Sequence, residues 1–279
     1  MKAARTELTA KVAAAFGEAA GANDRNGAGG AGAIASHLVE HARLLPGWRV
    51  LDAGCGAGAV LIRAARAVAP GGQVFGVDLA SGMLARAERE AERAGVRDRV
   101  VLSRGDAAAP AFGPASFDAI LASVVFCLLP DPGTAAARWR ELLVPGGTLA
   151  FARLVATDPR WFPVIAAMDA HASDAHGFDT HAHRPGPPQA TTELLDGCGF
   201  AGVTSTIETI TFRYDGPQQW WETAASEGPW LTWRHIPARQ LAAARSEAIA
   251  LAGKLCEPDG SLLRRARMTF VTAYRAEEG

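Results

Sequence analysis

Short apolar runs and longer stretches with helical spacing alternate along this chain. Leu61, Ala65 and Val68, for example, recur at intervals of three or four residues after the apolar run that begins at Val50, as expected for a helix that follows a buried strand. The strands predicted in this way are 50–53, 73–77, 100–102, 117–123, 148–154, 203–212 and 267–274. Strands and helices that alternate at this spacing predict an α/β fold with a doubly wound parallel sheet.

Two interruptions of this alternation predict a cap over the sheet. Asp158-Pro159 opens a helix that a polar loop follows, and a second insertion begins at Asp215 and contains a helix that starts at Pro237. The glycine-rich stretch 21–32 is either part of a lid or a linker. The predicted units are an N-terminal helical lid (1–44), a ligand-binding core (45–154), a cap insertion (155–190), a helix and strand of the core (191–213), a helical cap insertion (214–263) and a last core strand with its tail (264–279).

A glycine-rich turn at Gly54, Gly56 and Gly58 joins the first strand to the helix that follows it. Without Cβ atoms the backbone can approach a ligand closely, and the N–H groups at a helix N-terminus favour a polar or anionic ligand group. The second strand ends at Asp78, where a carboxylate could bind two vicinal ribose hydroxyls. Together these features predict a βαβ unit that binds a nucleoside.

Two kinds of nucleoside ligand fit this unit. Gly54-x-Gly56-x-x-Ala59 loosely matches the dinucleotide fingerprint, which keeps a nicotinamide-dependent oxidoreductase as one alternative. Asp52, however, would place an unwanted negative charge near a pyrophosphate, whereas it suits a ligand with an ammonium and a sulfonium. Arg104-Gly105-Asp106-Ala107 and the segment LLVPGG at 142–147 then follow in order. This combination favours the second kind of ligand.

With these motifs the sequence resembles the class I S-adenosylmethionine-dependent methyltransferases. The resemblance is to their small-molecule branch, which includes the ubiquinone/menaquinone-type and actinobacterial secondary-metabolite enzymes, and it covers residues 45–153 closely and 190–213 more loosely. It implies a Rossmann-like, seven-stranded sheet whose last strand is antiparallel and lies beside the sixth, with a mainly helical cap. It also implies S-adenosylmethionine (SAM) as the cofactor and S-adenosylhomocysteine (SAH) as its product.

The resemblance places the cofactor contacts at the ends of the first four strands. The cofactor-binding residues that it implies are Asp52, Gly54, Cys55, Gly56, Gly58, Asp78, Leu79, Met83, Gly105, Asp106, Ala107, Ser123 and Val124. Asp78 is expected at the ribose, Asp106 at the adenine amino group and Asp52 near the methionine end. The alternative is that these are ordinary loop or surface acids. Cys55 is expected to be a small filler of the turn rather than a nucleophile.

The acceptor side is predicted from the cap and the N-terminal helix. The aromatic residues expected to line a substrate pocket are Phe16, Phe126, Trp161, Trp220, Trp221 and Trp230, and the alternative is that the tryptophans pack a core. His171, His176 and His181, in the polar loop, are candidates for a general base, with a solvated loop as the alternative. Aspartates accompany these histidines, but no pair has helical ligand spacing, so no metal site is predicted.

Composition narrows the partners of the chain. With 28 basic and 29 acidic residues, it has no basic excess to neutralise phosphates, so a nucleic-acid substrate is not expected. Four cysteines without paired or zinc-like spacing indicate a reducing compartment. No apolar run approaches the roughly 18 residues of a membrane-spanning helix, so no membrane contact is expected and a cytoplasmic location is predicted.

The sequence therefore predicts a methyltransferase that acts on an apolar small-molecule acceptor at oxygen, carbon or nitrogen, in bacterial secondary metabolism. The second hypothesis is a cyclase or another non-methylating natural-product enzyme in which the donor is a structural ligand. A nicotinamide-dependent oxidoreductase is the third. The sequence leaves the acceptor, the base and a homodimeric state open.

Overall fold

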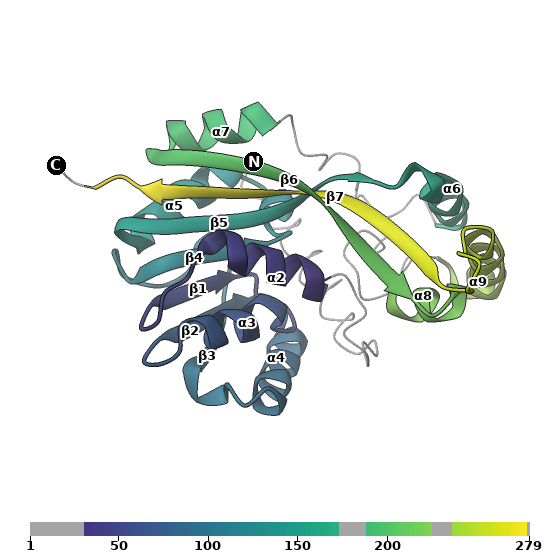
Figure 1. Cartoon of the computed structure of the whole chain (residues 1–279), viewed down its shortest axis with the longest axis horizontal. Coiled ribbons are helices and arrows are strands. Elements are labelled where there is room, and N and C mark those ends of the chain that lie inside the picture. The colour runs from purple at the N-terminus through teal and green to yellow at the C-terminus, as the bar shows by residue number, and fades with distance from the viewer. Residues whose placement is uncertain (1–30, 173–187, 225–235, 278–279) are drawn as a thin grey trace.

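A seven-stranded mixed sheet organises the chain in the computed structural model, which describes residues 31–172, 188–224 and 236–277 (Figure 1). Its strands are β1 (Arg49–Ala53), β2 (Gln73–Asp78), β3 (Val100–Arg104), β4 (Phe117–Ser123), β5 (Leu143–Thr157), β6 (Phe200–Tyr214) and β7 (Leu262–Arg275). They lie in the order β3-β2-β1-β4-β5-β7-β6. The first five strands pair in parallel, whereas β7 is antiparallel to both β5 and β6. The predicted Rossmann-like sheet with an antiparallel last strand is confirmed.

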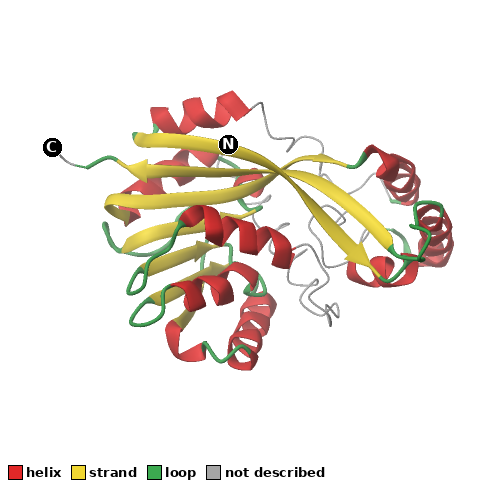
Figure 2. Cartoon of the chain, viewed as in Figure 1, coloured by secondary structure: helices red, strands yellow, loops and turns green. Residues whose placement is uncertain are grey.

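Helices cover both faces of this sheet (Figure 2). The core elements are α2 (Ala31–Ala42), α3 (Ala59–Ala67), α4 (Ser81–Arg93), α5 (Pro132–Leu142), α7 (Pro188–Gly197) and the short turns η1 (Arg97–Arg99) and η2 (Phe126–Leu128). One buried apolar cluster joins α2 and α3 to one face of the sheet, and a second joins α5 and α7 to the other. Because both faces are covered, β4 is apolar along most of its length.

Three long strands carry the cap, and here the structure departs from the prediction. The cap elements are η3 (Pro159–Trp161), α6 (Phe162–His171), α8 (Pro217–Ala224) and α9 (Ala238–Gly253), at the far ends of β5, β6 and β7 (Figure 1). Paired residues such as Tyr214 and Leu262 extend the sheet past the predicted strand ends. The prediction stops too early because these extensions contain charged residues. One of them, Arg264, is buried with its guanidinium carbon 4.1 Å from the ring centre of Phe212.

Tryptophans pack the junction between the extended strands and the cap helices. Trp161 and Trp220 are fully buried with ring centres 4.9 Å apart, and Trp221 lies 6.4 Å from Trp220. Both α6 and α8 pack against α9. The buried cap residues belong to the same apolar cluster as α2 and α3, so the cap and this face of the sheet share one core. In the part of the chain that the structure describes, no helix combines the length and the apolarity needed to cross a bilayer.

Candidate functional site

The glycine-rich turn lies at the carboxyl end of β1, where the chain crosses into α3. Gly54, Gly56 and Gly58 have φ angles of 75°, 51° and 92°. The N–H groups of Gly54 and Cys55 both donate to the carbonyl oxygen of Val77, at 2.8 and 3.0 Å, which ties the turn to the end of β2. A Cβ atom at Gly56 would meet nothing within 4 Å. The turn is therefore held by β2 on one side and open to a ligand on the other.

Asp78 fixes this turn through its carboxylate. One oxygen accepts a hydrogen bond from the N–H of Gly56 and the other from the N–H of Ala80, each at 2.9 Å. Burial raises the pKa of Asp78, and the backbone donors of Ala80, Gly56 and Leu79 act in the opposite direction. Each carboxylate oxygen can accept a further hydrogen bond, so the side chain can hold the turn and still bind ribose hydroxyls.

Asp52, on the adjacent strand β1, has a buried carboxyl group that is only partly hydrogen-bonded by the described residues. Its side chain is 1% exposed, and Oδ2 has no hydrogen-bond partner in the described structure. Burial raises its pKa to about 8, a hydrogen bond with the backbone at Leu61 lowers it, and the negative charge of Asp78 adds to the rise. An unpartnered buried oxygen of this kind fits a cationic ligand group. The ammonium and sulfonium of the implied cofactor meet that requirement.

The loop after β3 brings Gly105, Asp106 and Ala107 to the same edge. The N–H of Gly105 donates to the carbonyl oxygen of Asp78 at 3.0 Å. One carboxylate oxygen of Asp106 accepts the N–H of Ala108 at 2.8 Å, and the carbonyl of Ala107 accepts the indole N–H of Trp139 at 2.8 Å. The loop is thus held in place with part of the Asp106 carboxylate still available, as an adenine contact would require.

Three further implied cofactor residues surround the turn. Cys55 is buried, and desolvation, followed by the charges of Asp52 and Asp78, raises the pKa of its thiol well above the ordinary value. It is therefore a neutral side chain that does not favour nucleophilic chemistry. Met83 is buried at the start of α4, and the carbonyl of Leu79 accepts a hydrogen bond from Arg104 at 3.1 Å.

The chain bends sharply at the carboxyl end of β4, after Ser123. Val124 has a φ of 59°, and its N–H donates to the carbonyl of Ala152 at 2.8 Å. Positive φ in a β-branched residue is a strained conformation that other contacts must maintain. The bend directs Val125 against Gly54, so the ends of β1 and β4 are packed together. Strain at this edge, where the prediction puts the donor and the acceptor, is consistent with a functional role.

The structure describes four of the six predicted acceptor aromatics and places three of them in packed cores. Phe126 is buried and stacks on Phe151, with ring centres 4.4 Å apart. Trp161 and Trp220 have no exposed surface, whereas Trp221 is partly exposed. Core packing thus accounts for three of these residues, and a pocket-lining role for any of them stays a prediction. Phe16 and Trp230 lie outside the described residues.

Of the three histidine candidates for a general base, His171 alone lies among the described residues. His171 ends α6, and its Nε2 lies 2.8 Å from a carboxylate oxygen of Glu247 on α9. His176 and His181 fall outside the described residues. Within the described ranges, no group of three or more potential ligands is placed to hold a metal ion.

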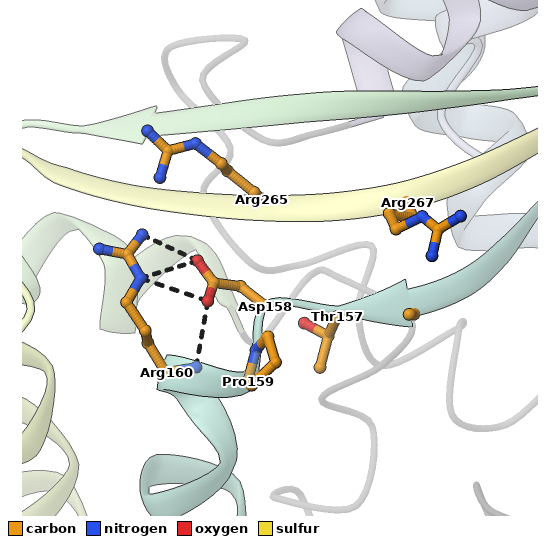
Figure 3. Close-up of a pocket in the computed structure, with 7 residues that line it drawn as sticks. Thr157, Asp158, Pro159, Arg160, Arg265 and Arg267 are labelled. Carbon is orange, nitrogen blue, oxygen red and sulfur yellow. Dashed lines mark hydrogen bonds and ion pairs between the residues drawn. The ribbon is translucent and has the colours of Figure 1, made fainter.

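Two polar features of the structure are missed by the sequence analysis. His37 and His41 of α2 both contact Glu208 of β6. Arg160, Arg265 and Arg267 line a cavity of about 280 Å³ between the end of β5 and β7 (Figure 3). The sequence signals are weak: a histidine pair four residues apart, and two arginines two residues apart where the last predicted strand begins.

Comparisons with known proteins identify the family. A family model described as a methyltransferase domain matches residues 50–147. Nocamycin O-methyltransferase of Saccharothrix syringae is 33% identical over 248 residues, which cover 84% of this chain and 88% of that relative. Aklanonic acid methyltransferase DauC of Streptomyces sp. (strain C5) is 38% identical over 206 residues, covering 68% of this chain and 92% of the relative. The chain belongs to the class I SAM-dependent methyltransferases, as its motifs predict.

Solved structures agree with this fold. The [4+2]-cyclase SpnF superposes with a TM-score of 0.58 and 22% identity, over 88% of this chain and 82% of that one. At this level of identity the similarity concerns the fold alone. A shared fold does not choose between methyl transfer and cyclisation, because the reaction is set by the site.

Proposed function

We propose that this methyltransferase moves the methyl group of SAM to an oxygen atom of an apolar small-molecule acceptor in bacterial secondary metabolism. The names of the relatives, which specify nocamycin and aklanonic acid, support a small-molecule acceptor, and the first name supports oxygen as the methylated atom. The observation that carries the proposal is the arrangement at the glycine turn. There Asp52, a buried acid whose Oδ2 has no hydrogen-bond partner among the described residues, lies beside Asp78, whose carboxylate fixes the turn.

Each acidic residue of the donor site is proposed to bind a different part of SAM. Asp78 would accept hydrogen bonds from the ribose hydroxyls, Asp106 would accept one from the adenine amino group, and Asp52 would balance the positive charge of the methionine end. Gly54, Gly56 and the rest of the turn allow close approach of the backbone. When bound, SAM supplies a methyl group already activated by its sulfonium. The residues of the chain therefore have to bind and orient the donor and the acceptor and to exclude water. They do not have to activate the donor.

The acceptor side has to align a nucleophile with the methyl carbon and the sulfur. Positioning of this kind can lower a barrier by up to about 7–11 kcal/mol. Ser123 and Val124 hold the backbone at the end of β4, where the acceptor oxygen would meet the donor. The extended strands and cap helices, with the N-terminal segment as a lid, would exclude water. His171, His176 or His181 would serve as the base if the acceptor is a phenol or an enol.

Calorimetric titration with SAH tests the donor site. The wild type is expected to bind SAH, and Asp78→Ala to bind it at least about tenfold more weakly, because the variant loses both carboxylate oxygens. Asp98→Ala provides a matched control, since this acid in η1 is exposed and paired only with its neighbour Arg99. Circular dichroism of each variant checks folding. A wild type that binds no SAH, or an Asp78→Ala variant that binds as the wild type does, contradicts the proposal.

A cyclase reaction is the second candidate, because the [4+2]-cyclase SpnF has a similar fold and the fold is compatible with both reactions. The two reactions differ in the mass of their products. Methyl transfer yields a product one methyl group heavier than the acceptor and converts SAM to SAH, whereas cyclisation leaves SAM intact. Mass spectrometry of both the product and the cofactor after incubation with candidate acceptors therefore separates them.

A further inference from the structure

An arginine-lined cavity opens where β5 ends, away from the glycine turn. Its volume is about 280 Å³, and it is lined by Ala156, Thr157, Asp158, Pro159, Arg160, Arg265 and Arg267. Figure 3 shows Arg265 and Arg267 extending from β7, while Arg160 reaches Asp158 from the turn after β5. The lining thus combines three guanidinium groups with one carboxylate, an excess of positive charge in a small concave site.

Asp158 provides the one carboxylate among the described residues that line the cavity, and it is paired with Arg160. Arg160 binds Asp158 through two nitrogens, with Nε to Oδ2 at 3.0 Å and Nη2 to Oδ2 at 2.8 Å. Asp158 also accepts the N–H of Arg160, which caps the turn η3. Hydrogen bonds from the Arg160 side chain lower the pKa of Asp158 against the effect of its burial, and the charge of Arg265 lowers it further. Asp158 and Arg160 therefore largely neutralise each other, and no second carboxylate lines the cavity beside Arg265 and Arg267 among the described residues.

Arg265 and Arg267 make no ion pair or side-chain hydrogen bond in the described structure, although both line the cavity. They lie two residues apart on β7 and so point to the same face of the sheet. Their cross-strand neighbours on β6 are Thr211 and Thr209, whose hydroxyls are further donors. On the other side, β5 presents Ala156 opposite Arg267, a side chain too small to fill the space. A planar anion such as a carboxylate matches paired guanidinium groups.

The same face continues from the cavity toward the donor edge. Thr269, two residues beyond Arg267, is fully buried, and its hydroxyl has no hydrogen-bond partner in the described structure. Ala152 of β5 pairs with Ser123 at the carboxyl end of β4, and the cavity begins four residues further along β5. At about 3.3 Å per residue, roughly 13 Å separates the two places. A ligand that reaches both must be elongated.

We propose that this cavity binds an anionic group, a carboxylate or a phosphate, at the end of the methyl acceptor that is remote from the reacting oxygen. The inference rests on the proposed function, because it takes the donor edge as the place of methyl transfer. It makes the acceptor amphiphilic, with an apolar body toward the donor edge and an acidic end on β7. The bound anion is held rather than methylated, so the product keeps its acidic group.

Calorimetric titration of the full chain with 2-naphthoate and with neutral 2-naphthamide tests the subsite without knowledge of the natural acceptor. The wild type is expected to bind 2-naphthoate at least about tenfold more tightly than the amide. The double variant Arg265→Gln/Arg267→Gln is expected to bind both equally. Arg213→Gln is the matched control, because Arg213 lies on the same face of β6 but is paired with Asp259 at 2.7 Å. Equal binding of the two probes by the wild type, or an unchanged preference in the double variant, overturns the proposal.

Inorganic phosphate distinguishes an acceptor subsite from a site for a free anion. Phosphate lacks an apolar body and is expected to bind more weakly than 2-naphthoate. If phosphate binds as tightly as 2-naphthoate, and the double variant loses both equally, the cavity is a site for a free anion and not a subsite for the acceptor. All titrations are run with and without SAH. If the protein binds SAH but shows no preference for 2-naphthoate, the subsite proposal is wrong and the methyltransferase proposal is unaffected. If it prefers 2-naphthoate but does not bind SAH, the donor-site proposal alone is wrong.

Discussion

Gly54 and Val125 lie so close that a Cβ atom on Gly54 would stand 2.5 Å from Cγ2 of Val125. This contact joins the glycine turn after β1 to the segment after β4, its parallel neighbour in the sheet. Gly54 also has a φ of 75°, which an L side chain rarely adopts. Steric and conformational requirements therefore act together at this one position, between the donor turn and the strand end where the acceptor is proposed to lie.

Gly54→Ala is expected to lower the free energy of unfolding by about 2–4 kcal/mol, from backbone strain and from the clash with Val125. Gly95→Ala is the matched control, since Gly95 has a φ of 69° but nothing within 4 Å of an added Cβ. That variant is expected to lose only about 1 kcal/mol, from the backbone alone. Urea denaturation of both measures the difference. Equal losses would mean that the contact with Val125 is not what requires glycine.

Binding of SAH is expected to depend on pH through Asp52. Below its pKa of about 8 the carboxyl of the free protein is mostly neutral, because it is buried and lies near Asp78. The ammonium of SAH favours the carboxylate, so binding releases a proton and the affinity increases from about pH 6 to about pH 8. Titrations in buffers with different ionisation enthalpies count this proton. Asp52→Asn is expected to remove the dependence, and a wild-type affinity that does not change with pH contradicts it.

The same ionisation affects the stability of the ligand-free protein. The folded-state pKa of Asp52 lies above its ordinary value of 3.8, so the contribution of this group to stability is full below that value and is lost as the pH rises toward about 8. Asn keeps the shape of the side chain and cannot ionise. Asp52→Asn is therefore expected to be more stable than the wild type at pH 8, by on the order of a few kcal/mol, and to approach it near pH 4. A stability difference that is constant with pH would argue against the raised pKa.

Neighbouring valines after β4 are expected to respond differently to glycine. Val124 has a φ of 59°, so Val124→Gly relieves strain of about 1–3 kcal/mol that offsets the lost packing and the added chain entropy. Val125 has an ordinary φ of −90° and packs on Gly54, so Val125→Gly gains no such relief and is expected to cost about 2–3 kcal/mol. Thermal unfolding of the two variants tests this. If Val124→Gly is as damaging as Val125→Gly, Val124 is not strained.

The donor half of the molecule is largely predictable from the sequence. Gly54, Gly56 and Asp78 form a local motif, because the turn and the end of the next strand lie next to one another in any parallel βαβ unit. The structure adds what the motif does not specify. Asp78 holds the turn through the N–H of Gly56, and Asp52 is buried with no partner for Oδ2 in the part of the chain that the structure describes.

The cap half could not be predicted in the same way. Its strands depend on pairing between segments far apart in the chain, such as Tyr214 with Leu262 and Thr157 with Ala266. Charged residues inside these strands hide the alternation that would reveal them, and one of them, Arg264, is buried with its guanidinium over the ring of Phe212. The functional meaning of the tryptophans is equally non-local. Trp161 and Trp220 pack against each other from elements about 60 residues apart, which no spacing rule predicts.

Glu208 of β6 contacts two histidines of α2, a segment far away in the sequence, and this contact predicts how stability depends on pH. Its two oxygens lie 2.5 Å from Nδ1 of His37 and 2.6 Å from Nε2 of His41, and both imidazoles stack on Phe270. Burial raises the pKa of Glu208, but hydrogen bonds with His41 and His37 and their charges bring it below the ordinary value of 4.5. The carboxylate therefore stabilises the fold above that value, and this contribution is lost as the pH falls through the lowered pKa.

Glu208→Gln is accordingly expected to cost about 1 kcal/mol of unfolding free energy at pH 7 and less at pH 3, because the carboxylate becomes protonated as the pH falls. Glu40→Gln is the control. Glu40 is exposed on α2, the helix that contains His37 and His41, so this variant should leave the free energy of unfolding unchanged at both pH values. Hydrogen exchange should also report faster opening of α2 in Glu208→Gln alone, because Glu208 attaches this helix to β6. Since α2 is the element through which the proposed lid joins the sheet, loosening it should weaken SAH binding as well. A cost that is the same at both pH values would show that packing, rather than the shared carboxylate, anchors the helix.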